Sequence, residues 1–312
     1  MMLKNTLKLA FVNSSNIWKT LLYRILCLLC VLGLTTVIAW PIINALIKDN
    51  FFVNLQNSFE KMIFNLNFEK IFLTIDEIFK NFANIIANHG LTVQTILFGV
   101  FILFLVSMLE TYLKVAVNQT INGYMSSLTK YGFTNSFVAN FGKATILGLA
   151  KTITVLPLNL LIWFGSYFMM SALYAKIGVI AIILTLLLLI VLLSLKATLF
   201  SGWIPALLIH DESVFVSLKK GISAVSKRFF RTLSSFLITI VSLFVINTFA
   251  LVFTAGVGVI ITLPITTLVL LILGEVMYFE SLGMRYYVDG EHIISPKKLE
   301  QQDSFSKVKD II

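Results

Sequence analysis

The stretch HDESVFVSLKKGISAVSKRFFRTL, residues 210–233, places five Lys or Arg between two of the most apolar parts of the chain. Lys and Arg gather in this way beside the cytoplasmic ends of membrane spans. On a helix beginning near Ser213, apolar side chains recur at steps of three and four, which predicts an amphipathic helix in the cytoplasmic interface. The predicted lipid-facing residues are Val214, Phe215, Leu218, Ile222, Val225 and Phe229.

The composition extends this interpretation to the whole chain. Of the 312 residues, 58% are apolar and 12% are charged, and the mean hydropathy is +0.93. Soluble globular domains contain about 45–50% apolar and about 25% charged residues, so we expect a polytopic membrane protein. The net charge of +9 favours the anionic headgroups of a lipid bilayer as the partner. Nucleic acid is not expected, because the cations are scattered around apolar segments and form no basic soluble face.

Six segments are long and apolar enough to be transmembrane helices, each of which needs roughly 20 largely apolar residues. This predicts an all-α bundle of six transmembrane helices with interfacial amphipathic helices. Short connections over residues 174–176 and 255–258 predict two tight turns. The predicted spans are residues 25–47, 91–109, 146–173, 177–195 with a weak extension to 209, 233–254 and 259–279.

The distribution of cations predicts the orientation. With both termini in the cytoplasm, 19 of the 24 Lys and Arg fall on the cytoplasmic side, as the positive-inside rule requires. We therefore expect a single integral membrane domain over residues 1–290 and a polar cytoplasmic tail over residues 291–312. The abundance of Lys, Asn, Ile and Phe is typical of AT-rich bacterial genomes, so the expected location is a bacterial plasma membrane. The five cations outside this pattern are Lys48, Lys61, Lys70, Lys80 and Lys176.

Cytoplasmic amphipathic segments are expected over residues 118–144 and 210–232, and the N-terminal residues 3–24 have a similar pattern. Each precedes a pair of spans, which suggests three repeated units. The segments are interpreted either as docking surfaces for lipid or for a membrane protein partner, or as connectors that obey the positive-inside rule. The candidate lipid-surface contacts are Lys219, Lys220, Lys227, Arg228 and Arg231.

The outer loop over residues 48–90 is too long for a simple turn and mixes Phe and Ile with Asn, Glu, Asp and Lys. We expect two short amphipathic helices there. They would either pack over the ends of the spans or form a lid above a cavity.

Ionisable residues near the spans are candidates for function, because charge in hydrocarbon is costly and is usually paired. Counted along the spans, they share one depth near the cytoplasmic boundary. We expect a ring of ion pairs there: Glu110 or Glu275 with Lys151 or Lys196, and Glu110 with Lys114 one helical turn away. The ring would either hold the helices in register or gate an ion or substrate.

Two prolines mark candidate helix kinks near mid-membrane. Pro157 lies in the third span and Pro264 lies in the sixth, where each would free backbone carbonyls. Such kinks line cavities in transporters and also occur in passive bundles.

Catalytic and cofactor motifs are not found in the sequence. Cys27 and Cys30 have the CxxC spacing, but they lie within an apolar span that has no His, Lys or acidic neighbour. The three histidines are too scattered for a metal cluster. We therefore expect no catalytic residue, no metal and no cofactor.

Residues 200–290 resemble a group of bacterial six-span proteins that includes the membrane domain of some glycerophosphodiester phosphodiesterases. The resemblance rests on the order of WIPALLIHDESVFVSLKKGISAVSKRFFRTL, two spans and LGEVMYFESLGMRYYVDGE. It implies a membrane architecture and no catalytic residues, because the phosphodiesterase domain is not part of this sequence.

The leading functional hypothesis is a non-enzymatic membrane component that organises lipid or partner proteins. A small-solute or lipid transporter is the main alternative, and an intramembrane enzyme comes third.

Overall fold

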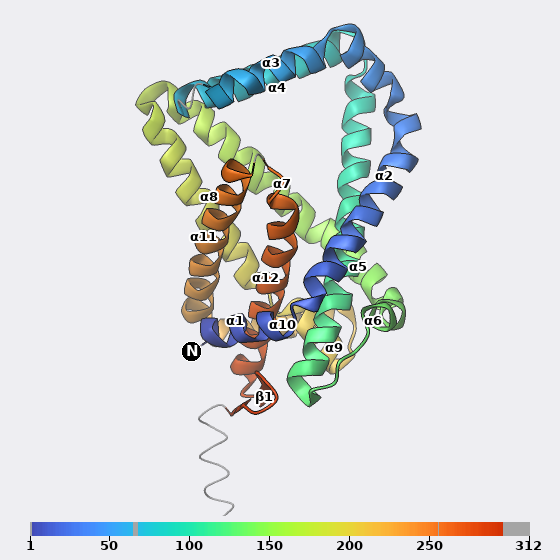
Figure 1. Ribbon diagram of the computed structural model, residues 1–312, viewed down its shortest axis with the longest axis vertical. Coiled ribbons are helices and arrows are strands. Elements are labelled where there is room, and N and C mark those ends of the chain that lie inside the picture. The colour runs from blue at the N-terminus through green and yellow to red at the C-terminus, as the bar shows by residue number, and fades with distance from the viewer. Residues whose placement is uncertain (1, 65–67, 255, 296–312) are drawn as a thin grey trace, which may run out of the picture. The chain divides into compact units, whose positions relative to one another are not determined.

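The computed structural model describes residues 2–64, 68–254 and 256–295, with the side chains of residues 61–72 left out. Nearly all of this part is helical, which confirms the all-α prediction (Figure 1). Residues 296–312, which form most of the predicted polar tail, and Ala255 in the predicted turn lie outside the described residues.

Six helices among the described residues are long and apolar enough to cross a membrane, and each holds most of one predicted span. Short helices connect them, and a pair of two-residue strands, β1 (Tyr286–Tyr287) and β2 (Ile293–Ile294), pairs antiparallel near the end. The long helices are α2 (Ser15–Lys48), α5 (Thr92–Ser127), α7 (Phe141–Ile177), α8 (Val179–Phe200) with α9 (Trp203–His210), α11 (Phe229–Phe253) and α12 (Val259–Leu282). The remaining helices are α1 (Met2–Val12), α3 (Phe51–Phe64), α4 (Phe68–Asn88), α6 (Phe133–Ala139) and α10 (Val214–Ser226).

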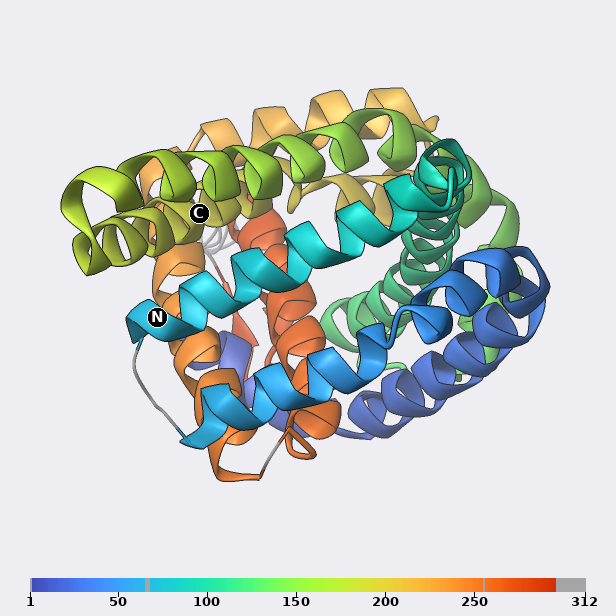
Figure 2. The same cartoon turned by 90° about the horizontal axis from the view of Figure 1, so that it is seen from above.

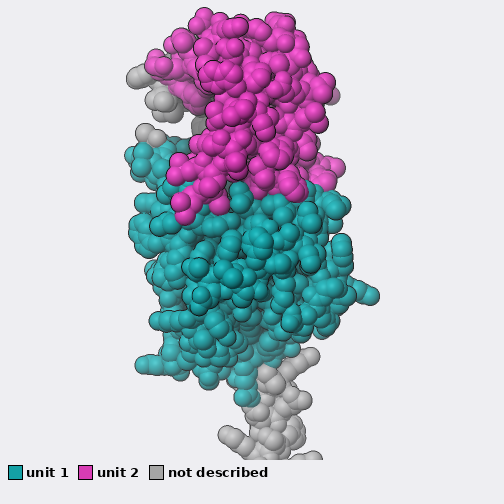
Figure 3. Space-filling view, turned by 90° about the vertical axis from the view of Figure 1, so that its right-hand side faces the viewer, with its two compact units in different colours: residues 1–25, 108–155, 188–312 teal, residues 26–107, 156–187 magenta. Residues whose placement is uncertain are grey.

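The chain divides into two compact units, coloured separately in Figure 3. The first unit comprises the described residues within 1–25, 108–155 and 188–312. The second unit comprises those within 26–107 and 156–187.

Helix α12 is the centre of the first unit. Helices α1, α9, α10 and α11 pack against it, and α1 lies across the ends of α11 and α12 (Figure 1). Every residue from Glu275 to Glu280 is buried, as expected for a helix that is apolar on nearly all sides. The core around it is formed by Leu9, Leu113, Ile121, Met125, Phe236, Ile272, Val276 and Phe279.

Helices α9 and α10 pack closely because two glycines meet at their contact. A Cβ atom added at Gly221 would lie 2.7 Å from the backbone of Gly202, so no larger residue fits without movement. Small residues let helix backbones approach in this way. Trp203 is fully buried beside this contact, and its Nε1 donates a hydrogen bond to the carbonyl of Val214 at 2.8 Å.

The second unit contains α3 and α4, which pack side by side (Figure 2). The expectation of two short helices over residues 48–90 is thus met. Together with the end of α2 they form a small core, whose buried members are Ile42, Ala45, Leu46, Phe51, Ile85 and Ile86. Tyr167 of α7 donates a hydrogen bond to Asp76 of α4 at 2.7 Å. Asp76 also accepts a hydrogen bond from the Lys80 ammonium. This bond, and to a lesser extent the one from Tyr167, lowers the pKa of Asp76.

Three local expectations are wrong. Residues 118–127 do not begin a separate amphipathic segment: α5 continues through them, and Asn118, Thr120 and Ile121 are buried. No proline interrupts this stretch, so the helix has no reason to end at the predicted boundary. The turn predicted at residues 174–176 lies at Gly178, which adopts a left-handed φ of 55° that favours glycine.

The predicted lipid-facing side of α10 is the third correction. The buried side consists of Val214, Ser217, Gly221, Ala224 and Val225, which pack inside the first unit. Phe215 and Ile222 are exposed, at 65% and 38%. Small residues therefore make the protein-facing side, and the exposed apolar residues are fewer than hydrophobic periodicity predicts.

Candidate functional site

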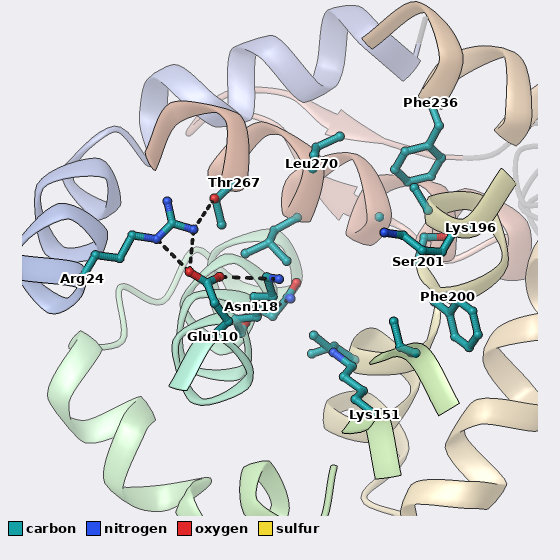
Figure 4. Close-up of a pocket in the computed structure, with 16 residues that line it drawn as sticks. Arg24, Glu110, Asn118, Lys151, Lys196, Phe200, Ser201, Phe236, Thr267 and Leu270 are labelled. Atoms are coloured by element: carbon teal, nitrogen blue, oxygen red, sulfur yellow. Dashed lines mark hydrogen bonds and ion pairs between the residues drawn. The ribbon is translucent and has the colours of Figure 1, made fainter. Parts of the chain in front are cut away.

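A cavity of about 260 Å³ lies within the first unit (Figure 4). Side chains from α2, α5, α7, α8, α9, α11 and α12 line it, together with Ser201 between α8 and α9. The polar lining consists of Arg24, Glu110, Lys114, Asn118, Lys151, Lys196, Ser201 and Thr267. Four of these side chains are cationic and one is a carboxylate, so the cavity has a formal surplus of positive charge.

Arg24 and Glu110 form the shorter of the two ion pairs described in the lining. The Nε of Arg24 donates to Glu110 Oε1 at 2.9 Å, and its Nη2 lies 2.8 Å from the same oxygen. The Nη2 also donates to Thr267 Oγ1 at 2.8 Å. A single guanidinium thus joins α2, α5 and α12, and its planar fork suits this task better than a lysine would.

Lys114 takes the other oxygen of the same carboxylate. Its Nζ lies 3.5 Å from Glu110 Oε2, one helical turn along α5, as the sequence predicts. Asn118 follows one further turn on and donates its amide to the carbonyl of Lys114 at 3.1 Å. Both oxygens of Glu110 are therefore engaged by cations.

Lys151 and Lys196 lie on the other side of the cavity from Glu110 (Figure 4). The Nζ of Lys151 lies 5.9 Å from the centre of the Trp203 ring, a cation–π distance. Lys196 comes from α8, beside Phe200 and Ser201. The ion pairs of Glu110 that the structure shows are with Arg24 and Lys114, so the predicted pairing with Lys151 or Lys196 stays a prediction.

Glu275 is not part of the cavity lining. Its side chain is fully buried, and neither carboxyl oxygen has a hydrogen-bond partner among the described residues. The neighbouring Gly274 does line the cavity, where an added Cβ would lie 3.2 Å from the carbonyl of Ser201. The predicted pairing of Glu275 with Lys151 or Lys196 is therefore wrong.

Three of the five candidate lipid-surface cations pair with carboxylates instead. Lys220 binds Glu212, and Arg228 and Arg231 lie 3.7 and 3.6 Å from Glu280 Oε2. Lys219 and Lys227 are exposed. The lipid contact predicted for these five cations stays a prediction.

Glu280 is the centre of a second polar cluster, at the end of α12. Tyr286 donates its hydroxyl to Glu280 at 3.1 Å and accepts the Asn5 amide at 2.8 Å. Burial raises the pKa of the Tyr286 hydroxyl, and the nearby charge of Glu280 raises it further. The cluster joins α1, α11, α12 and the β hairpin and explains why α1 docks on this end of the unit.

Neither predicted kink residue lines the cavity. The helices α7 and α12 continue through Pro157 and Pro264. Near Pro264, Asn247 of α11 donates to Thr266 at 2.9 Å and accepts from Thr262 at 2.7 Å, so polar groups join α11 to α12. Neither Cys27 nor Cys30 is part of a disulfide bond. Within the described part of the chain, no group of three His, Cys, Asp or Glu is placed to hold a metal ion.

Arg24 is the site residue that sequence analysis missed, because it was counted only as a cytoplasmic charge. Its position gives a signal: it is the last ionisable residue before the predominantly apolar first span.

Comparison with protein-family models, with curated proteins and with solved structures gives no match. The resemblance of residues 200–290 to the phosphodiesterase membrane domain therefore stays a prediction.

Proposed function

We propose that this protein is a non-enzymatic multi-pass membrane protein that holds an anionic lipid headgroup in the cavity formed around Arg24, Lys114, Lys151 and Lys196. The observation that carries the proposal is the charge of the lining: four cations meet one carboxylate. A site of surplus positive charge that is partly shielded from water favours an anion. The apolar remainder of the lining, which includes Phe200, Phe236 and Leu270, suits the first carbons below a headgroup.

The proposed orientation supports a lipid as the ligand. Arg24, Glu110, Lys151 and Lys196 each stand near the end of a predicted span that the distribution of Lys and Arg assigns to the cytoplasmic side. In a bacterial plasma membrane with both termini inside, the cavity would then lie at the depth of the inner headgroups. The anionic lipids of that leaflet would be the ligands closest to it.

Lipid-resolved native mass spectrometry tests the proposal. The full chain is reconstituted in nanodiscs that contain equal amounts of phosphatidylglycerol and phosphatidylcholine. We expect phosphatidylglycerol to be retained preferentially, and the double variant Lys151→Met, Lys196→Met to lose this preference.

The matched control is the double variant Lys219→Met, Lys227→Met, which removes two exposed cations outside the cavity. It should retain the wild-type preference. Equal retention of both lipids by the wild-type protein would overturn the proposal. A loss of preference in the control alone would assign lipid binding to the surface of α10.

A second candidate function is transport of a small anionic solute. The polar set of Asn247, Thr262 and Thr266 within two otherwise apolar helices favours it, because such groups can line a path. A flux assay in liposomes on wild type and a Lys196→Ala variant distinguishes the two functions. Flux that depends on Lys196 would support transport, and no flux in either protein counts against it.

A further inference from the structure

We infer that the cavity selects a lipid that ends in a phosphate monoester over a lipid whose phosphate is a diester. This inference rests on the proposed function and names the chemical class of its ligand. It starts from the way in which the charges are divided between the two sides of the cavity (Figure 4).

On one side, the negative charge of Glu110 is already shared by two cations. Arg24 lies 2.8 Å from Oε1 and Lys114 lies 3.5 Å from Oε2. Among the described residues that line the cavity, Glu110 is the sole carboxylate. The lining described here therefore combines four cationic side chains with one carboxylate.

On the other side stand Lys151 and Lys196. Lys151 is held against the ring of Trp203, which attracts a cation through its π electrons but carries no negative charge. The ring itself is fixed by the Nε1 hydrogen bond to Val214 at 2.8 Å. No ion pair joins Lys151 Nζ to a described carboxylate. Its ammonium group can therefore donate hydrogen bonds to a ligand in the cavity.

The charge and shape of the two phosphate classes then decide between them. A phosphate monoester carries about −1.5 to −2 charges near pH 7 and presents three acceptor oxygens. A diester carries one charge and two free oxygens. Each lysine has three donors, so Lys151 and Lys196 together can donate to all three oxygens of a monoester. The monoester therefore offsets more of the surplus charge.

The size of the cavity is compatible with this ligand. A volume of about 260 Å³ corresponds to several water molecules, each of which occupies about 30 Å³ in the liquid. This is enough for a phosphate group and the carbons next to it. The acyl chains would remain outside, among the exposed apolar side chains of the helices.

Competition between two lipids tests the inference. Nanodiscs of phosphatidylcholine receive equal small amounts of phosphatidic acid, a monoester, and phosphatidylglycerol, a diester. The wild-type protein should retain phosphatidic acid about fivefold better, the effect of roughly one further charge next to a basic residue. Lys151→Met or Lys196→Met should bring the ratio close to one.

Two controls separate charge from folding. Lys151→Arg keeps the charge and should keep the preference, and Lys219→Met changes an exposed cation outside the cavity and should also keep it. A soluble arm adds inorganic phosphate or glycerol 3-phosphate to the lipid-loaded protein. Displacement of phosphatidic acid at comparable concentrations would assign the site to a free phosphate and overturn the lipid as its source.

The outcomes distinguish this inference from the proposed function. Equal retention of the two anionic lipids, both above phosphatidylcholine, would overturn the monoester preference and leave the proposed function standing. Retention of neither above phosphatidylcholine would overturn both. A preference that survives the loss of both lysines would place the monoester site elsewhere.

Discussion

Arg24 and Glu110 are 86 residues apart in the chain, yet two nitrogens of the arginine lie within 2.9 Å of one carboxylate oxygen of the glutamate. The pair joins the beginning of the first long helix to the second, and the same guanidinium reaches Thr267 on the sixth. It therefore links three helices around the cavity while it removes one negative charge from the lining. Its roles in stability and in ligand selection can be tested separately.

Replacing Arg24 by Gln should lower the free energy of unfolding by about 1 to 2 kcal/mol, because charge-assisted hydrogen bonds to a partly buried carboxylate are lost. Lys114 remains beside Glu110 and limits the loss. Thermal unfolding in detergent measures the effect. The exposed Lys48→Gln variant at the end of the same helix is the control, and an equal loss in both would contradict a specific role for the pair.

Replacing Glu275 by Leu should stabilise the protein by about 1 to 3 kcal/mol, because a buried carboxyl group without a partner is removed. Glu280→Leu on the same helix is the matched comparison. It should destabilise, since Glu280 accepts from Tyr286 and lies beside Arg228 and Arg231. A marked loss of stability in Glu275→Leu would show that this carboxyl group has a stabilising partner.

Gly221→Ala should destabilise the contact between α9 and α10 by about 1 to 3 kcal/mol, the usual effect of overpacking. The added methyl group would meet the backbone of Gly202 at 2.7 Å, and backbone cannot rotate away. Gly165→Ala in α7 is the control, because nothing lies within 4 Å of its Cβ position. This control should be neutral or slightly stabilising. Unchanged stability in Gly221→Ala would mean that the two helices separate easily.

Acid should act on the β hairpin through Asp289. A hydrogen bond from the His292 ring, together with the backbone N–H groups of Glu291 and His292, lowers the pKa of Asp289 from 3.8 to about 2. A lowered folded-state pKa means that the charged carboxylate stabilises the fold above about pH 4. This contribution is lost as the pH falls through 2.

An NMR titration of the Asp289 carboxyl carbon checks this prediction. The midpoint should lie near 2 in the wild-type protein and should move towards 3.8 in His292→Ala. The His89→Ala variant, which changes a histidine of the second unit, should leave it unchanged. A wild-type midpoint at or above 3.8 would show that the His292 contact does not form in solution.

The orientation can be tested with single cysteines in a chain whose Cys27 and Cys30 are replaced by Ser. A maleimide that cannot cross membranes, added to intact cells, should label Lys176→Cys and should not label Lys219→Cys. Both positions are exposed in the structure, so burial does not confound the result. The reverse pattern would place the cavity on the outer side.

Much of the architecture could be predicted from the sequence, because apolar length alone identifies a membrane-spanning helix. Each long helix in the structure holds most of a predicted span. Helix ends were harder to predict. The α5 helix passes its expected end because no proline stops it, and the α7 helix continues to a glycine that the apolar pattern does not reveal.

Partner choice is what the sequence could not supply. Four of the five charged residues that line the cavity, all except Arg24, are candidates from the sequence, but their shared depth says nothing about which helix faces which. Arg24 pairs with Glu110, for which the sequence suggests Lys151 or Lys196, and Glu275 is not part of the cavity lining. Likewise, periodicity placed the apolar face of α10 towards lipid, whereas Ser217, Gly221 and Ala224 make its buried side.

The presence of a lipid phosphate in the cavity can be measured directly by solid-state NMR, as the dipolar coupling between lipid ³¹P and lysine ¹⁵Nζ in bilayers that contain anionic lipid. We predict a coupling from Lys151 and Lys196 that disappears in the Lys151→Met, Lys196→Met variant and persists in the Lys219→Met, Lys227→Met variant. Coupling confined to Lys219 and Lys227, or none at any lysine, would contradict the binding of a headgroup in this cavity.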